Sequence, residues 1–89
     1  MIEFEDCSGW KWVDGPDVIE FTADLDGHTF VCRVTGECIE DHCGDPKTAG
    51  EFLDAAKNNF GAITDRVHDL IAGGRYEPDG SILVRTTDW

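Results

Sequence analysis

The spacing of apolar residues predicts one long amphipathic helix over Thr48–Ala72. A stripe of apolar side chains recurs at intervals of three or four residues, which places them on one face of an α-helix: Leu53, Ala56, Phe60, Ile63, Val67 and Leu70. Thr48 and Glu51 form a capping box at the start, and Gly73-Gly74 follows the end. Gly61 falls inside this helix, where glycine costs about 1 kcal/mol relative to alanine, and indicates a bend or a close backbone contact.

Upstream, the alternation of apolar and polar residues predicts a β-hairpin over Val18–Val34. Its centre is Asp26-Gly27, a dipeptide suited to a type I′ turn. Pairing Leu25 with His28 gives a register in which one face is apolar. The pairs on that face are Ile19–Val34, Phe21–Cys32 and Ala23–Phe30, and those on the other are Glu20–Arg33, Thr22–Val31 and Asp24–Thr29. A shift by one residue would turn the two phenylalanines to opposite faces, so the pattern specifies the register.

Three shorter elements complete the predicted fold. Ile2 and Phe4 alternate with Glu3 and Glu5, a pattern that suits a short edge strand. Thr35 can cap a short helix over Gly36 to about Cys43, which Gly44 can end in the left-handed conformation. Ile82–Thr86 follows a Pro-Asp-Gly turn and predicts a final strand.

Together these elements predict an α+β fold in one domain, residues 1–89. We expect an antiparallel sheet of three to four strands, built from the N-terminal hairpin and the C-terminal strand. A short and a long helix should pack on one face of this sheet. The core should lie where four helix residues meet four hairpin residues: Leu53, Phe60, Ile63 and Val67 against Phe21, Phe30, Cys32 and Val34.

Acidity is the most unusual property of the composition. The 89 residues include 19 acidic and 7 basic side chains, for a formal net charge of −12. Residues 1–45 hold 12 of the acids and only 2 of the bases. Such a surface repels phosphate groups, which argues against nucleic acid and anionic membranes as partners. A basic protein surface is the partner it favours, and the alternative is that the acidity serves only solubility.

Targeting signals and membrane spans are not predicted. The N-terminal residues have neither a positive region nor an apolar core typical of a secretory signal, and no apolar run approaches the roughly 20 residues of a membrane span. We therefore expect a cytoplasmic protein with reduced cysteines, as a monomer or weak homodimer.

The region before the hairpin holds two tryptophans, Trp10 and Trp12, that share a face if the backbone is extended. Their rings either cover the edge of the core or offer an exposed anchor to a partner. Glu40, Asp41 and His42 lie in the acidic half on the short helix. These five residues are the candidate partner-binding residues.

Several segments form a pattern known from other proteins: Val18, Phe21, Asp26-Gly27, Val31-Cys32-Arg33-Val34, Cys38-Ile39-Glu40-Asp41-His42-Cys43-Gly44, Asp79–Val84 and Thr86-Thr87-Asp88-Trp89. With these residues the chain resembles, over Ile2–Trp89, the DUF1488 family of small bacterial proteins of unknown function. The chain departs from the family at Cys43, where the family usually has an aromatic residue, and at Asn59-Phe60, where an Asn-Arg pair is usual. The resemblance implies the α+β fold and a cytoplasmic bacterial protein, and it implies no mechanism.

Cys38 and His42 are the residues that an enzyme or a metal site would use. They lie four residues apart on the short helix, so they can share a face. Cys38 in the first turn would have its pKa lowered by the helix dipole, with His42 as base. With Cys32 the pair could instead bind zinc. However, no paired Cys-x-x-Cys spacing and no oxyanion loop accompany them.

The leading prediction is therefore a small acidic, non-catalytic interaction or regulatory protein. It includes no catalytic residue, no cofactor and no metal ligand, and it treats the four cysteines as buried or incidental thiols. The alternative is a small thiol-dependent enzyme or a metal-binding protein that uses Cys38 and His42.

Overall fold

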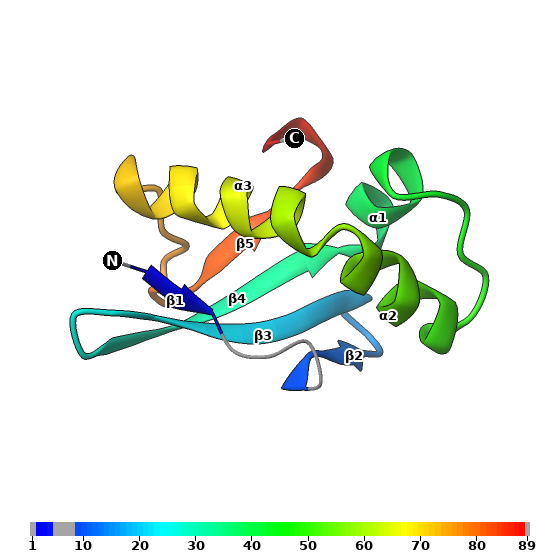
Figure 1. Ribbon diagram of the computed structural model, residues 1–89, viewed down its shortest axis with the longest axis horizontal. Coiled ribbons are helices and arrows are strands. Elements are labelled where there is room, and N and C mark those ends of the chain that lie inside the picture. The colour runs from blue at the N-terminus through cyan, green and yellow to red at the C-terminus, as the bar shows by residue number, and fades with distance from the viewer. Residues whose placement is uncertain (1, 5–8, 89) are drawn as a thin grey trace.

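A mixed, mostly antiparallel sheet of five strands carries three helices on one face (Figure 1). The computed structural model describes residues 2–4 and 9–88. In chain order the elements are β1 (Ile2–Phe4), β2 (Lys11–Val13), β3 (Val18–Leu25), β4 (His28–Thr35), α1 (Gly36–His42), α2 (Ala49–Asn58), α3 (Phe60–Ala72), β5 (Ile82–Val84) and the 3-10 turn η2 (Thr86–Asp88). The predicted α+β class is confirmed.

The β3–β4 hairpin has the predicted register at every pair, from Leu25 opposite His28 to Ile19 opposite Val34. Asp26 and Gly27 have φ values of +50° and +86°, as a type I′ turn requires. Alternation therefore places one set of side chains under the helices and the other on the open face.

Two short strands share the far edge of β3. β1 pairs with its C-terminal end, where Phe4 lies opposite Ala23, and β2 pairs with its N-terminal end, where Val13 lies opposite Val18. The predicted N-terminal edge strand is confirmed for residues 2–4, and Glu5, its last predicted residue, lies outside the described residues. Trp10, just before β2, is buried, and its ring stacks on Phe21 with centroids 4.1 Å apart.

The prediction of one long helix over Thr48–Ala72 is wrong. Asn59, with φ −117° and ψ 25°, separates α2 from α3. Its Nδ2 donates to the carbonyl of Ala55 at 2.8 Å, so the side chain competes with the backbone for a helix carbonyl. The interruption therefore lies two residues before Gly61, whose missing Cβ would point into open space.

This break also changes which residues of the stripe are buried. Leu53 and Phe60 are only partly buried and pack at the margin of the core. Phe52 and Ala56 are the buried residues of α2. In α3 the predicted core positions Ile63 and Val67 are buried, together with Thr64, Leu70 and Ile71. The core still lies between the helices and the hairpin face, as expected.

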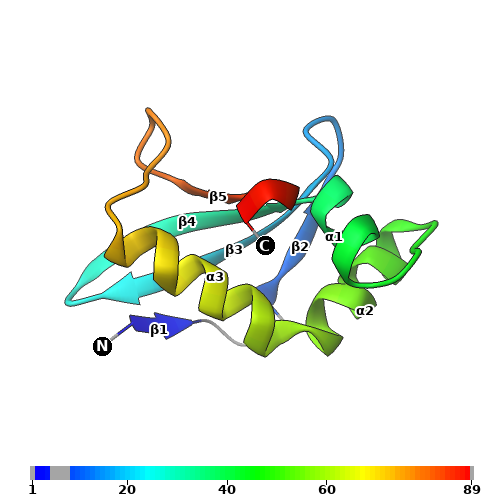
Figure 2. The same ribbon diagram turned by 90° about the horizontal axis from the view of Figure 1, so that it is seen from above.

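The C-terminal strand differs from the prediction in direction and length. β5 pairs with β4 in parallel, with Cys32 opposite Ile82 and Val34 opposite Val84, and it ends before Thr86. A parallel pair needs a long crossover rather than a tight turn, and residues 36–81 supply it with three helices. Figure 2 shows α3 running back along the sheet, so the chain enters β5 from the end where β4 begins.

Helix ends follow the predicted local signals. The Thr35 hydroxyl accepts from the Cys38 N–H at 3.1 Å, and the Thr48 hydroxyl accepts from the Glu51 N–H at 3.2 Å. After α3, the Arg75 N–H donates to the Leu70 carbonyl, and Gly74 has a φ of +68°. This geometry is a Schellman ending, which satisfies the last helix carbonyls.

Candidate functional site

Where α1 begins, a groove of about 580 Å³ opens between the β2–β3 turn and the helices α1 and α2. We call it the acidic groove; its lining residues are Trp12, Pro16, Asp17, Thr35, Gly36, Glu37, Glu40 and Phe52. Three of these residues carry carboxylates and none is basic. The lining itself therefore carries only negative charge, and Lys47, which interacts with Glu40, lies outside it.

Two aromatic rings form one wall of the acidic groove. Trp12 stacks on Phe52 with ring centroids 4.4 Å apart and planes 22° from parallel. The indole Nε1–H of Trp12 donates to the Asp14 carboxylate at 2.6 Å. Trp12 is half-buried, so part of its ring is exposed while its orientation is held from two sides.

Next to these rings, the β2–β3 turn closely approaches the start of α1. The Gly36 N–H donates to the Asp17 carbonyl at 2.8 Å, and Asp17 has a left-handed φ of +52°. A Cβ at Gly36 would lie 3.0 Å from that carbonyl oxygen and 3.2 Å from Trp12 Cη2. Glycine at this position therefore allows the turn, the helix and the indole to meet.

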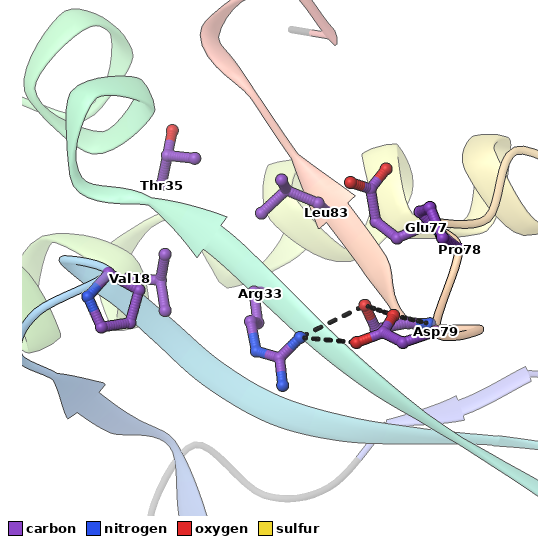
Figure 3. Close-up of a pocket in the computed structure, with 9 residues that line it drawn as sticks. Val18, Arg33, Thr35, Glu77, Pro78, Asp79 and Leu83 are labelled. Atoms are coloured by element: carbon purple, nitrogen blue, oxygen red, sulfur yellow. Dashed lines mark hydrogen bonds and ion pairs between the residues drawn. The ribbon is translucent and has the colours of Figure 1, made fainter.

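A second groove, of about 500 Å³, lies on the sheet face that carries no helices (Figure 3). We call it the open-face groove; its lining residues are Pro16, Val18, Arg33, Thr35, Glu77, Pro78, Asp79, Ser81 and Leu83. The turn before β5 forms one wall and Pro16 the other, with Val18 and Leu83 between them. Pro16 and Thr35 line both grooves.

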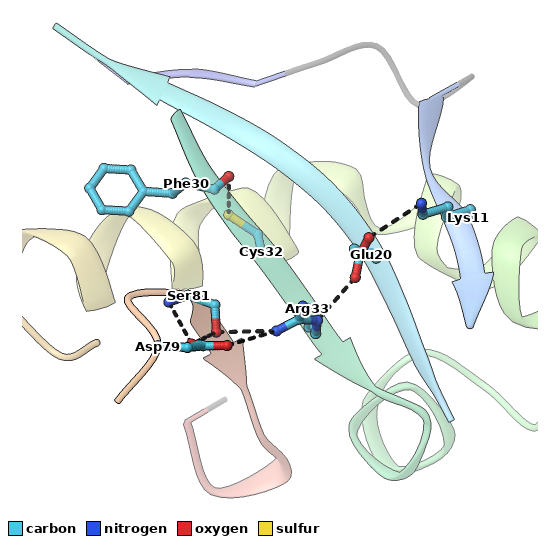
Figure 4. A network of polar contacts seen from close by, with 7 residues as sticks. All are labelled: Lys11, Glu20, Phe30, Cys32, Arg33, Asp79 and Ser81. Atoms are coloured by element: carbon cyan, nitrogen blue, oxygen red, sulfur yellow. Dashed lines mark hydrogen bonds and ion pairs between the residues drawn. The ribbon is translucent and has the colours of Figure 1, made fainter. Parts of the chain in front are cut away.

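Arg33 is the centre of a polar network across this open face (Figure 4). Its Nε donates to Glu20 at 3.0 Å, and its Nη1 lies 3.2 Å from the Ser81 hydroxyl and 3.8 Å from the Asp79 carboxylate. Glu20 also pairs with Lys11 at 3.4 Å. The guanidinium charge is thus compensated from two sides.

The polar network lowers the pKa of two carboxylates, those of Glu20 and Asp79. Partial burial acts to raise the pKa of Glu20, but hydrogen bonds and charge from Arg33 and Lys11 outweigh it, so the pKa is lowered. The hydroxyl and backbone N–H of Ser81 lower the pKa of Asp79. Both groups therefore remain ionised at neutral pH.

The fold brings two of the five candidate partner-binding residues together. Trp12 and Glu40 line the acidic groove, whereas Trp10 is buried in the core. Asp41 and His42 are directed at η2, where the Thr86 hydroxyl donates to Asp41 at 3.1 Å and the Thr86 carbonyl lies 3.3 Å from His42 Nε2. Our sequence analysis did not include Asp17, Glu37 and Phe52 in the site, because no local pattern links them to Trp12.

Burial makes the thiols of Cys38 and Cys43 less acidic than a free cysteine. Burial is the main cause that raises the pKa of Cys38 to about 12, and nearby Cys43, Asp41 and Asp88 add to it. The pKa of Cys38 is therefore raised rather than lowered as the position at the helix N-terminus predicted, because burial disfavours the charged thiolate. Burial also raises the pKa of Cys43. Among the described residues, no group of three potential ligands is placed to hold a metal ion.

These features define a small α+β protein with one helix-covered and one open sheet face. A crystal structure of a protein of unknown function from the DUF1488 family, from Shewanella loihica PV-4, has the same fold. The two share a TM-score of 0.84 and 20% sequence identity over 93% of this chain and 90% of that chain. The fold implied by the resemblance is thus confirmed.

Comparisons with family models and with curated proteins found no match and therefore suggest no activity. In residues 2–4 and 9–88, no helix is long and apolar enough to cross a membrane.

Proposed function

We propose that this chain is a DUF1488 protein of the bacterial cytoplasm that binds a basic protein surface and has no catalytic activity. The observation that carries the proposal is the acidic groove, where Asp17, Glu37 and Glu40 surround the exposed part of Trp12 without a basic residue in the lining. The formal net charge of −12 adds long-range attraction toward a cationic partner. The protein acts as a monomer or weak homodimer.

An arginine or lysine side chain suits this groove chemically. A guanidinium can lie against an indole face while its N–H groups donate to carboxylates. Because Trp12 is already held by Phe52 and Asp14, little conformational entropy is lost when the partner binds. Phosphate groups would meet only carboxylates here, so the same groove disfavours nucleic acids.

A thiol-dependent enzyme has less support. Cys38 is fully buried and its raised pKa leaves almost no thiolate at neutral pH. His42 lies beside the Thr86 carbonyl on the exposed side of α1. Neither residue lines the acidic groove or the open-face groove.

The test uses a hexa-arginine peptide as a defined basic probe in isothermal titration calorimetry. We expect binding at low salt that Glu40→Lys weakens about tenfold, because it places a cation inside the groove. The matched control is Asp54→Lys, which makes the same charge change at an exposed position of α2 outside the groove. Equal weakening by both variants would show that only net charge matters, and the groove would then have no special role.

A second arm asks whether a cellular partner behaves in the same way. Wild type, Glu40→Lys and Asp54→Lys are used as baits in a bacterial lysate at low salt. A protein retained by wild type and Asp54→Lys, and lost from Glu40→Lys, is the expected result.

A further inference from the structure

The acidic groove and the open-face groove are neighbours at the end of the sheet where β3 begins and β4 ends, since Pro16 and Thr35 line both. We refer to the two neighbouring grooves together as the channel. We infer that this channel binds an extended segment of a protein partner, with a basic side chain in the acidic groove and an aliphatic side chain in the open-face groove. This inference rests on the proposed function and specifies the partner's sequence.

The open-face groove offers an apolar surface to the second side chain. Leu83 of β5 is half-buried on a sheet face that no helix covers, and it provides most of the exposed apolar surface because Val18 of β3, on the far side of β4, is only 4% exposed. Pro16 and Pro78 also line this groove, and Figure 3 shows Pro78 in the turn before β5. An aliphatic side chain placed here would remove the remaining apolar surface of Leu83 from water.

The charges that line the open-face groove do not repel a basic peptide segment. Arg33 is the cation in the lining, and Glu20 and Asp79 lie 3.0 Å and 3.8 Å from its guanidinium nitrogens (Figure 4). The Arg33 charge is compensated, so it does not repel an approaching lysine or arginine. Glu77 on the rim is paired with Arg85 at 2.8 Å. The channel is therefore acidic at one end and close to neutral at the other, which sets the direction of the bound segment.

Extended chains direct alternate side chains to opposite sides. Two side chains that enter the same channel should therefore be separated by an even number of positions. We expect the aliphatic residue two or four positions from the lysine or arginine.

The experiment selects binders from a displayed library of random 12-residue peptides against the full chain. We expect enrichment of a lysine or arginine with a leucine, isoleucine or valine at an even spacing. Leu83→Asn should abolish the aliphatic preference and leave the basic preference, and Glu40→Lys should do the reverse. Val31→Asn is the matched control, since Val31 is 37% exposed on the same sheet face but lines neither groove. Leu83→Ala provides a second variant with a smaller effect on folding.

The outcomes distinguish a failure of the channel alone from a failure of the proposed function. Enrichment of basic residues with no preferred aliphatic position would overturn the channel and leave the proposed function intact. An aliphatic preference that survives in both Leu83 variants would also overturn it. A selection with no basic enrichment would overturn both the channel and the proposed function.

Discussion

Trp12 in β2 stacks on Phe52 in α2, with ring centroids 4.4 Å apart. The contact joins the short edge strand to the helical layer across forty positions of sequence. Stacked aromatic pairs contribute about 0.5–1.5 kcal/mol beyond the burial of their area. Gly36 lies directly beside the pair, 3.2 Å from the indole when a Cβ is added and 3.5 Å from the Phe52 ring. The packing of these three residues fixes the shape of the acidic groove.

Gly36→Ala should reduce the free energy of unfolding by about 1–3 kcal/mol, because the new methyl group would press against the Asp17 carbonyl and the indole. Urea denaturation measures the change. Gly61→Ala in α3 is the control, since a Cβ there meets nothing within 4 Å; it should raise stability by about 0.5–1 kcal/mol. Similar effects from both substitutions would contradict the close approach at α1.

Glu20 should make stability depend on pH. Its folded-state pKa lies below the ordinary value of 4.5, so the carboxylate stabilises the fold above the unfolded-state pKa. This contribution is lost as the pH falls through the folded-state pKa. Wild type should therefore be more stable than Glu20→Gln at pH 7, and the difference should shrink progressively below about pH 4.5. Denaturation curves at pH 7, 5, 4 and 3 test this, with Asp54→Asn as a variant outside the network. A difference that is constant with pH would argue against the Arg33 and Lys11 contacts.

Cys38 should resist alkylation in the folded protein. Burial is the largest cause that raises its pKa to about 12, and the thiolate is the reactive form, so iodoacetamide at neutral pH should label it at least about a hundredfold more slowly than free cysteine. Peptide-resolved mass spectrometry separates it from the other cysteines, and labelling in urea provides the unfolded reference. Rapid labelling of Cys38 under native conditions would support the thiol-enzyme alternative.

Salt should weaken any complex formed at the acidic groove. The Debye length falls from about 10 Å at 0.1 M to about 3 Å at 1 M salt, so a captured basic partner should dissociate in high salt. Duplex DNA should not bind even at low salt, because the net charge of −12 repels its phosphates. A gel-shift titration tests the second point. Tight DNA binding, or a partner indifferent to salt, would contradict the electrostatic basis of the proposal.

The sequence by itself determined the parts of this fold that depend on near neighbours. The hairpin register follows from a two-residue alternation and from Asp26-Gly27, whose positive φ values were expected from residue type. The caps at Thr35 and Thr48 are equally local, since each hydroxyl bonds a backbone N–H three residues later. The acidic character of the first half is a property of composition and needs no structure.

Tertiary structure alone decided the helix break, the direction of β5 and the site. The apolar spacing continues across Asn59, so periodicity cannot reveal an interruption caused by one side-chain hydrogen bond to Ala55. A strand pattern is the same in parallel and antiparallel pairs, and the path of α3 over the sheet sets the direction. The acidic groove joins residues from the β2–β3 region, α1 and α2. What holds it together is a ring stack and the Gly36–Asp17 hydrogen bond, contacts between distant segments that exist only after the chain has folded.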